Sequence, residues 1–518
     1  MPCARRGSTR RATRAGIGVS LALAFAAAGP VAAPVAAHAA VRPVSATAGP
    51  TTAVIVEASS TGAAQFAVAA VGGSVDASLP IVAGVAAHVG PAGLAALLAD
   101  TTVRVVPDTT VHPTSASFDA GAVDTQIAAL DPSPDWSPDA GRGVAVALVD
   151  TGVTPTPDLH GSRLVVGPDL SGEGDGVDRY GHGTFMAGLI AGDGSASAGA
   201  TPRHLGVAPA ATLVSVKVAG ADGSTTVSRI IAGIGWVVSH RDTYGIGVLN
   251  LSFGVDAPMP RVLNPLVGAV EAAWASGITV VVSAGNDGAG HVTSPGDDPY
   301  VVTVGATDTG ATATTADDVI ASWSGSQRFH RYAKPDVVAP GVSVISLRAP
   351  GSTVDVAHPQ GRVDDVYFRG SGTSMSTALV SGAAAVLLSH HPAATPDDVK
   401  GALVDGAVSV GSGGRGVDLD RADHADARPE WWQHYRVAFD GLGRGFEHGM
   451  PWTASRWTAS RWTATRWTAT RWTATRWTDA QWDATRWTAT RWTATRWTAT
   501  RWTATRWTAE AWPSQSWG

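Results

Sequence analysis

An α/β fold, in which helices cover both faces of a parallel sheet, is predicted for the larger part of this 518-residue chain. From residue 144 onward, β-branched runs alternate with helical segments and Gly/Pro turns; the runs lie at residues 144–149, 212–218, 247–251, 278–282 and 300–304. This alternation is typical of parallel sheets with helical crossovers. The composition, 44% hydrophobic and 15% charged, favours a well-buried enzyme core over a disordered chain.

The first 40 residues are interpreted as a signal peptide. Several arginines precede an apolar run at residues 17–28, and small residues follow as far as Ala39 and Ala40. The run is shorter than the roughly 20 residues of a membrane-spanning helix, so no membrane span is expected in the mature chain. The single cysteine, Cys3, lies in this segment, so neither a disulfide nor a Cys-based metal site is expected. We therefore expect a secreted protein.

Residues 50–112 are predicted to form a small α+β domain of their own. Apolar stretches and helix candidates follow one another in the order β-α-β-β-α-β, which is the ferredoxin-like pattern. Residues 113–140 are rich in Ser, Asp, Pro and Gly and are interpreted as a linker or processing region. The α/β domain is placed at residues 141–424, and a second linker at residues 425–450.

The last segment, residues 451–518, repeats every five residues, mostly as Trp-Thr-Ala-Ser/Thr-Arg. A period of five gives tryptophan no one-sided stripe on either a helix or a strand, so we expect a low-complexity tail without regular structure. Tryptophan beside arginine suits contacts with carbohydrate or anionic polymers, which would attach the chain to a cell wall or another extracellular polymer. A stalk without a specific ligand and a self-association segment are the alternatives. The net charge of −6 gives no reason to expect nucleic-acid binding.

Three short motifs each place a polar residue where an apolar run or a glycine turn stops. Asp150 ends the first apolar run, His182 lies between glycines at a predicted helix start, and Ser374 follows a glycine-rich turn before an apolar helix. Taken singly, each residue has a plain structural role, such as capping a turn or a helix. Taken together, they supply the carboxylate, the imidazole and the hydroxyl that acyl transfer requires.

The motifs D-T-G, H-G-T and G-T-S-M occur here in the chain order Asp, His, Ser, and this combination resembles the subtilisin-like serine proteases. The resemblance, which extends over residues 144–422, implies that Asp150, His182 and Ser374 form a catalytic triad. The segment ending in Asn286 resembles the family's A-G-N motif, which implies that this amide binds the oxyanion. The resemblance also implies polypeptide substrates, no required cofactor, and an inhibitory propeptide at residues 50–112 that binds its own enzyme.

Further residues are assigned to substrate binding through the same resemblance. Ser252, Phe253 and Gly254 match a strand that pairs with the substrate backbone. Ala284 and Gly285 precede Asn286 in the oxyanion segment. Asp287 matches a position that can line the S1 pocket, where a carboxylate would favour a basic substrate side chain; a solvated turn acid is the alternative.

The chain departs from the family pattern at several positions. Phe185 and Met186 stand where the family usually has His-Val, and Ser376, Ala378 and Leu379 stand in place of Ala, Pro and His. None of these is a triad position. Family members often bind calcium, and the acid-rich stretch 169–178 could do so, but it has no recognisable ligand spacing and no metal ligand is assigned.

We therefore expect a secreted serine endopeptidase that is made as a precursor and cuts itself between His112 and Ala140. The competing interpretation is an exported binding or structural protein, in which the protease-like domain is a silent scaffold.

Overall fold

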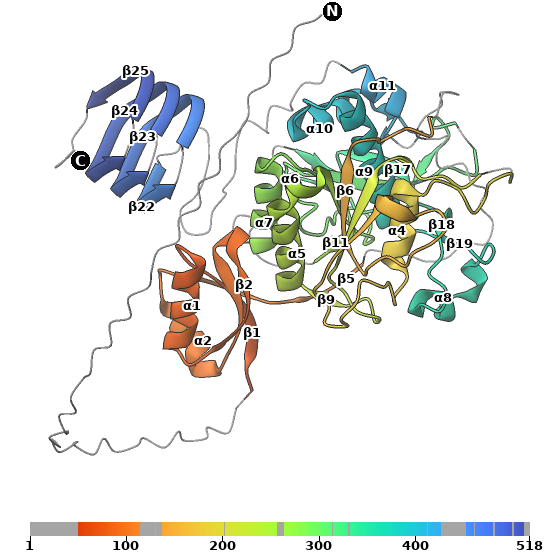
Figure 1. The fold of residues 1–518 in the computed structure, drawn as a ribbon, viewed down its shortest axis with the longest axis horizontal. Coiled ribbons are helices and arrows are strands. Elements are labelled where there is room, and N and C mark those ends of the chain that lie inside the picture. Colours follow the sequence, from red (N-terminus) through yellow and green to blue (C-terminus); the bar gives the residue numbers. More distant parts are fainter. Residues whose placement is uncertain are drawn as a thin grey trace, which may run out of the picture. The chain divides into compact units, whose positions relative to one another are not determined.

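The structure is a computed structural model that describes most of the chain from residue 50 to residue 425 (Figure 1). The described ranges are 50–113, 130, 137–200, 203–255, 264–312, 314–329, 332–411 and 413–425, and, in the C-terminal repeat, 452–459, 462–479, 482–499 and 502–511. The predicted signal peptide, most of the predicted processing region and the second linker lie outside these ranges.

The N-terminal unit is a four-stranded antiparallel sheet with two helices, in the strand order β2-β3-β1-β4. Its elements are β1 (Thr52–Glu57), α1 (Thr61–Ala70), β2 (Ser74–Leu79), β3 (Gly84–Val89), α2 (Pro91–Ala99) and β4 (Arg104–Pro107). Alternate residues of β1, Val54 and Val56, lie in one core with Val68 of α1 and Leu97 of α2. The predicted β-α-β-β-α-β order is thus present.

The large domain is built on a sheet in the order β20-β21-β17-β13-β12-β10-β6-β8-β7, and the pairs from β21 to β7 are parallel. The strands are β6 (Ala145–Asp150), β7 (Leu164–Asp169), β8 (Thr212–Lys217), β10 (Ile246–Leu251), β12 (Thr279–Ser283), β13 (Val302–Asp308), β17 (Val337–Pro340), β20 (Val408–Ser409) and β21 (Arg415–Gly416). Every residue of β6 and β12 is buried, which is why these strands are continuous apolar runs.

Helices cover the sheet as predicted, and the fold class is confirmed. They are α4 (His182–Ala191), α5 (Val227–Ser239), α6 (Arg241–Tyr244), α7 (Pro265–Ala275), α8 (Thr353–Ala357), α9 (Thr373–His390), α10 (Pro396–Asp405) and α11 (Leu419–Asp423). Helix α5 packs against α7, and α4 packs against α9, with α5 and α4 both in contact with β6 (Figure 1). Residues 373–387 of α9 are all buried, so this helix forms part of the core.

A short strand at the end of the N-terminal unit is paired with the large domain. Strand β5 (Thr110–Pro113) lies between β9 (Thr225–Thr226) and β11 (Phe253–Gly254) and is antiparallel to both. Just before β5, the Asp108 carboxylate accepts a hydrogen bond from the Ser228 N–H at 2.9 Å, in the first turn of α5. The helix N-terminus favours this negative charge.

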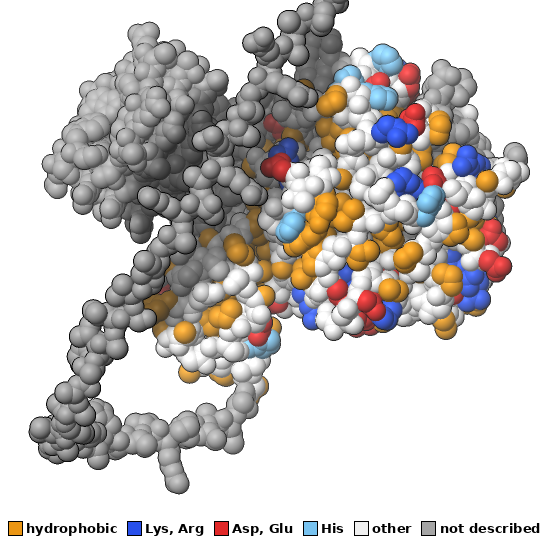
Figure 2. Space-filling view, viewed as in Figure 1, with side chains coloured by type: hydrophobic (Ala, Val, Ile, Leu, Met, Phe, Trp, Pro, Cys, Tyr) orange, Lys and Arg blue, Asp and Glu red, His pale blue; other side chains and the backbone are white. Residues whose placement is uncertain are grey.

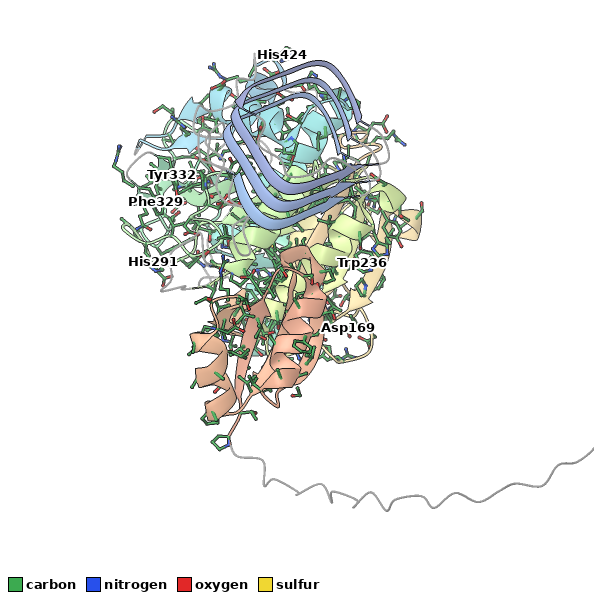
Figure 3. All side chains as sticks on the ribbon, turned by 90° about the vertical axis from the view of Figure 1, so that its left-hand side faces the viewer. Asp169, Trp236, His291, Phe329, Tyr332 and His424 are labelled. Atoms are coloured by element: carbon green, nitrogen blue, oxygen red, sulfur yellow. The ribbon has the colours of Figure 1, made fainter. Side chains whose placement is uncertain are left out.

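The C-terminal repeat forms strands, which differs from the expectation of a tail without regular structure. Its strands β22 (Trp452–Ala459), β23 (Trp462–Asp479), β24 (Trp482–Ala499) and β25 (Trp502–Ala511) are parallel neighbours. Trp452 pairs with Trp472 and Trp462 with Trp482, so an offset of 20 residues brings four pentapeptides into register with the next four. Figure 3 shows these strands as nested, bent ribbons. The one-sided stripe that the sequence argument required applies to a flat strand, whereas stacked coils need only identical residues in register.

Within the described residues, no helix combines the length and the apolar character that a membrane crossing requires. On the face of the large domain drawn in Figure 2, acidic and basic side chains lie beside one another, and no broad patch of one sign is visible.

Candidate active site

An acid and an imidazole meet where β6 ends and α4 begins. His182 Nδ1 lies 2.7 Å from Asp150 Oδ1, and the two side chains are only 2% and 1% exposed. Since a carboxylate accepts hydrogen bonds, Nδ1 carries the proton and Nε2 is left as the basic nitrogen. The Nε2 atom is buried and has no hydrogen-bond partner among the described residues. This arrangement is that of an oriented general base.

A third carboxylate, Asp178, holds the two loops together. Its Oδ1 accepts the Thr151 hydroxyl at 2.8 Å, and its Oδ2 accepts the Thr184 N–H at 2.8 Å and hydroxyl at 2.7 Å. The Thr151 hydroxyl in turn accepts the Gly183 N–H at 2.8 Å. Burial raises the pKa of the Asp178 carboxyl, and the hydrogen bonds it accepts oppose that shift. Sequence reasoning missed Asp178, although an acid four residues before His182 was the visible signal.

The glycine of the H-G-T motif is required by a close approach. A Cβ on Gly183 would lie 2.1 Å from the Gly152 carbonyl oxygen, closer than atoms can pack. The D-T-G and H-G-T motifs therefore contain glycine because their backbones touch.

Ser374 lies in the first turn of α9 and is wholly buried. Its hydroxyl donates to the Ser252 carbonyl at 3.3 Å, while Met375, the next residue, lines the same cavity as His182. The structure thus shows the acid–base hydrogen bond but not one between the base and Ser374. Such catalytic hydrogen bonds often form fully only when a substrate is bound.

Asn286 follows β12 and lies beside the start of α9. Its Oδ1 accepts the Thr373 N–H at 3.1 Å and the Thr373 hydroxyl at 3.0 Å. A backbone N–H can only donate, so the amide oxygen must face Thr373 and the Nδ2 group must face the opposite way. The amide donor is therefore oriented by the residue immediately before Ser374.

The residues assigned to pair with substrate already pair with a peptide segment. In β11, Phe253 lies opposite Pro113 and Gly254 opposite His112, and on the other side Val111 lies opposite Thr225. Val111 is only 2% exposed, whereas the next side chain, His112, is exposed. The site therefore holds an extended chain as a central strand and encloses alternate side chains.

The remaining assigned residues divide into two groups. Ala284 is buried, and Gly285 has a φ of +95° with Thr293 2.9 Å from where a Cβ would lie, so the backbone here is tightly fixed. Asp287 is 62% exposed and lies 3.5 Å from His291 Nδ1. This placement favours the alternative of a solvated turn acid over a residue that lines a pocket.

The acid-rich stretch 169–178 is neutralised from within. Lys217, whose side chain is 1% exposed, lies 2.7 Å from Glu173 Oε2, and Arg179 lies 2.7 Å from Asp175. The Arg179 guanidinium lowers the pKa of Asp175 to about 2. Asp169, labelled in Figure 3, accepts hydrogen bonds from Ser171 in its own loop. No group of three metal-ligating side chains occurs among the residues that the structure describes.

The departures from the family pattern lie around the site. Phe185 lines a cavity of about 560 Å³ next to His182, which sequence reasoning missed. Met186 is wholly buried. Ser376 donates to the Ala339 carbonyl at 3.0 Å, and Ala378 and Leu379 are buried in α9. None of them displaces a triad residue.

Comparisons with known proteins agree with this geometry. The Subtilase family profile matches residues 141–430. Serine protease AprX of Bacillus subtilis (strain 168) is 42% identical over 274 residues, which cover 51% of this chain and 61% of that one. Subtilisin Savinase of Lederbergia lenta is 37% identical over 276 residues, or 52% of this chain and 86% of its own. The fold is shared with fervidolysin from Fervidobacterium pennivorans, a keratinolytic enzyme related to subtilisin, at a TM-score of 0.58 and 24% identity, covering 74% of this chain and 62% of that one.

Proposed function

Because this chain belongs to the subtilase family, whose members are serine peptidases, we propose that it is a secreted endopeptidase that forms an acyl-enzyme on Ser374. The observation that carries the proposal is the buried pair of His182 and Asp150, 2.7 Å apart beside the helix that bears Ser374. Secretion is supported by the signal-like first 40 residues.

The proposed reaction uses each of these groups in turn. Ser374 Oγ attacks the substrate carbonyl carbon while His182 Nε2 takes the hydroxyl proton. The same proton passes to the amine nitrogen as the C–N bond breaks, and a water activated by His182 then hydrolyses the ester. Asp150 holds Nδ1–H throughout, and the Asn286 amide and the Ser374 N–H stabilise the oxyanion.

The register of β5 supports self-processing close to Pro113. His112 lies opposite Gly254 and Pro113 opposite Phe253, and the next residue of that substrate-binding segment is Ser252, whose carbonyl accepts the Ser374 hydroxyl. In an antiparallel pair, one more residue along the bound chain brings its carbonyl to the nucleophile. We therefore expect the first cut after Thr114, inside the region from His112 to Ala140. The N-terminal unit would then remain bound as an inhibitor through β5 and Asp108.

The Ser374→Ala variant tests this proposal. The wild type should release a mature chain that begins at Ser115 and should be labelled by a fluorophosphonate on Ser374. The variant should remain an uncut, unlabelled precursor with an unchanged circular dichroism spectrum. Normal maturation of the variant would refute self-processing. A folded wild type that takes up no label would instead favour the silent scaffold.

For the repeat tail, the function we favour is attachment to a cell wall or another extracellular polymer. The register of β22 to β25 sets equivalent residues opposite one another, such as Trp457 opposite Trp477 and Arg456 opposite Arg476. A regular array of aromatic and cationic residues matches a polymer that itself repeats.

A further inference from the structure

A cavity of about 560 Å³ adjoins His182, and its volume is typical of sites that bind organic ligands. Four apolar side chains line its interior: Phe185, Leu347, Phe368 and Met375. Each of them is less than 5% exposed, so the lining is set by the core of the domain. The cavity is therefore built to exclude water from an apolar group.

The cavity lies beyond the nucleophile, away from the acyl half of a bound peptide. That half is held between β9 and β11, and neither strand contributes to the lining. The lining does include His182 and Met375, the neighbour of Ser374. Because His182 must deliver a proton to the leaving amine, the residues after the scissile bond have to pass this histidine. Their side chains are the substrate groups that can enter the cavity.

One wall of the cavity is a segment that starts at Ser352 and includes α8, and it is fixed to the loop before His182. The Thr353 N–H donates to the Arg179 carbonyl and the Val354 N–H to the Tyr180 carbonyl, both at 2.9 Å. A Cβ on Gly181 would lie 2.6 Å from the Ser352 hydroxyl, so the loop and the wall are in close contact. The wall is thus positioned together with the general base.

The charges at the cavity neutralise each other. Arg348 and Asp355 line it, and they form two hydrogen bonds, at 2.6 and 3.0 Å. Arg362 adds a third bond to the same carboxylate at 2.7 Å. These pairs stiffen the wall and offer no excess charge to a ligand, so an ionised side chain would lose its hydration without gaining a partner.

We propose that this cavity binds a large apolar side chain from the leaving-group half of the substrate, within two residues of the scissile bond, and so selects where polypeptides are cut. This specificity site rests on the proposed peptidase function. It also gives a role to Phe185, where the family usually has histidine.

The test uses peptides that share the acyl half of residues 110–114 and carry Phe, Lys or Asp at the two positions after the cut. Mass spectrometry locates the cut, and kcat/KM is compared between peptides. A p-nitroanilide with the same acyl half has no leaving-group residues and reports the proposed function alone. The wild type should cleave the nitroanilide and should favour the Phe peptide over both charged peptides by about tenfold.

Two valines of α8 provide a matched pair of variants. Val354 lines the cavity, whereas Val356 is 65% exposed and does not. Val354→Asp should lower the preference for Phe over Lys about tenfold, and Val354→Lys should do the same for Phe over Asp. Val356→Asp and Val356→Lys should keep the wild-type ratios. A general loss of structure could not reverse its sign with the charge introduced.

The outcomes separate the two proposals. A wild type that cleaves the nitroanilide but treats Phe, Lys and Asp alike overturns the specificity site only. Equal ratios in the Val354 and Val356 variants overturn it as well. A folded, mature wild type that cleaves neither nitroanilide nor peptide overturns the peptidase function itself.

Discussion

Asp178 Oδ1 accepts the Thr151 hydroxyl at 2.8 Å, 27 residues away in the chain, and this contact joins the loop of Asp150 to the helix of His182. The same carboxylate holds Thr184 through its other oxygen. The separation of the acid and the base is therefore set by a residue that itself lies outside the triad.

Replacement of Asp178 by asparagine should lower kcat more than tenfold while changing KM little. The amide would present N–H groups to some of the donors that Asp178 now accepts, which costs a few kcal/mol and misplaces the imidazole. Hydrolysis of a p-nitroanilide gives both constants. Asp175→Asn, in the same loop but on the surface, is the control and should stay near wild type. Equal kcat values for the two variants would remove the positioning role.

Loss of the Asn286 amide should cost about 10²–10³ in kcat with little change in KM, since the donor acts on charge that appears only in the transition state. Asn286→Ala tests the whole side chain. Asn286→Asp keeps an oxygen for Thr373 but has no N–H, so it should lose at least as much activity. An aspartate variant with wild-type kcat would show that the amide does not bind the oxyanion.

Stability should depend on Asp318 between pH 4 and pH 6. Burial raises the pKa of this carboxyl from 3.8 to about 6, and the Thr307 hydroxyl only partly opposes the shift. The folded state therefore binds the proton more tightly than the unfolded state, so stability falls as pH rises from 3.8 to about 6.

Asp318→Asn, made in the Ser374→Ala background to prevent self-digestion, should raise Tm at pH 7 by about 2 °C and have little effect at pH 4. The exposed neighbour variant Asp317→Asn should show a smaller gain. A gain from Asp318→Asn that is as large at pH 4 as at pH 7 would contradict the assignment.

Calcium should not be needed to stabilise the loop at residues 169–178. Its carboxylates are already neutralised, since Glu173 pairs with the buried Lys217 and Asp175 pairs with Arg179. A chelator should leave the Tm of the Ser374→Ala precursor unchanged, whereas Lys217→Gln should lower it by several degrees. A large drop in Tm on chelation, reversed by calcium, would place a metal site in the chain.

The tail should carry attachment to extracellular polymer. A chain truncated before Met450 should keep its peptidase activity and lose sedimentation with isolated cell walls. If the truncated and full chains sediment equally, the tail is a stalk or a self-association segment.

Much of the fold was predictable because local patterns encode burial. Continuous apolar runs such as the one that ends at Asp150 specify strands buried on both faces, and the glycines around His182 specify a tight turn before a helix. The repeat tail was harder, because a five-residue period is informative only once the 20-residue offset between neighbouring strands is known.

By itself the sequence determined the α/β class, the β-α-β-β-α-β order of the N-terminal unit and the three motifs around Asp150, His182 and Ser374, since each depends on residues adjacent in the chain. Only the tertiary structure decided that Asp178 joins two of these motifs, that Asp287 faces solvent and that α8 walls a cavity beside His182. These relationships depend on which distant segments pack together, and that is set by register and packing over the whole domain.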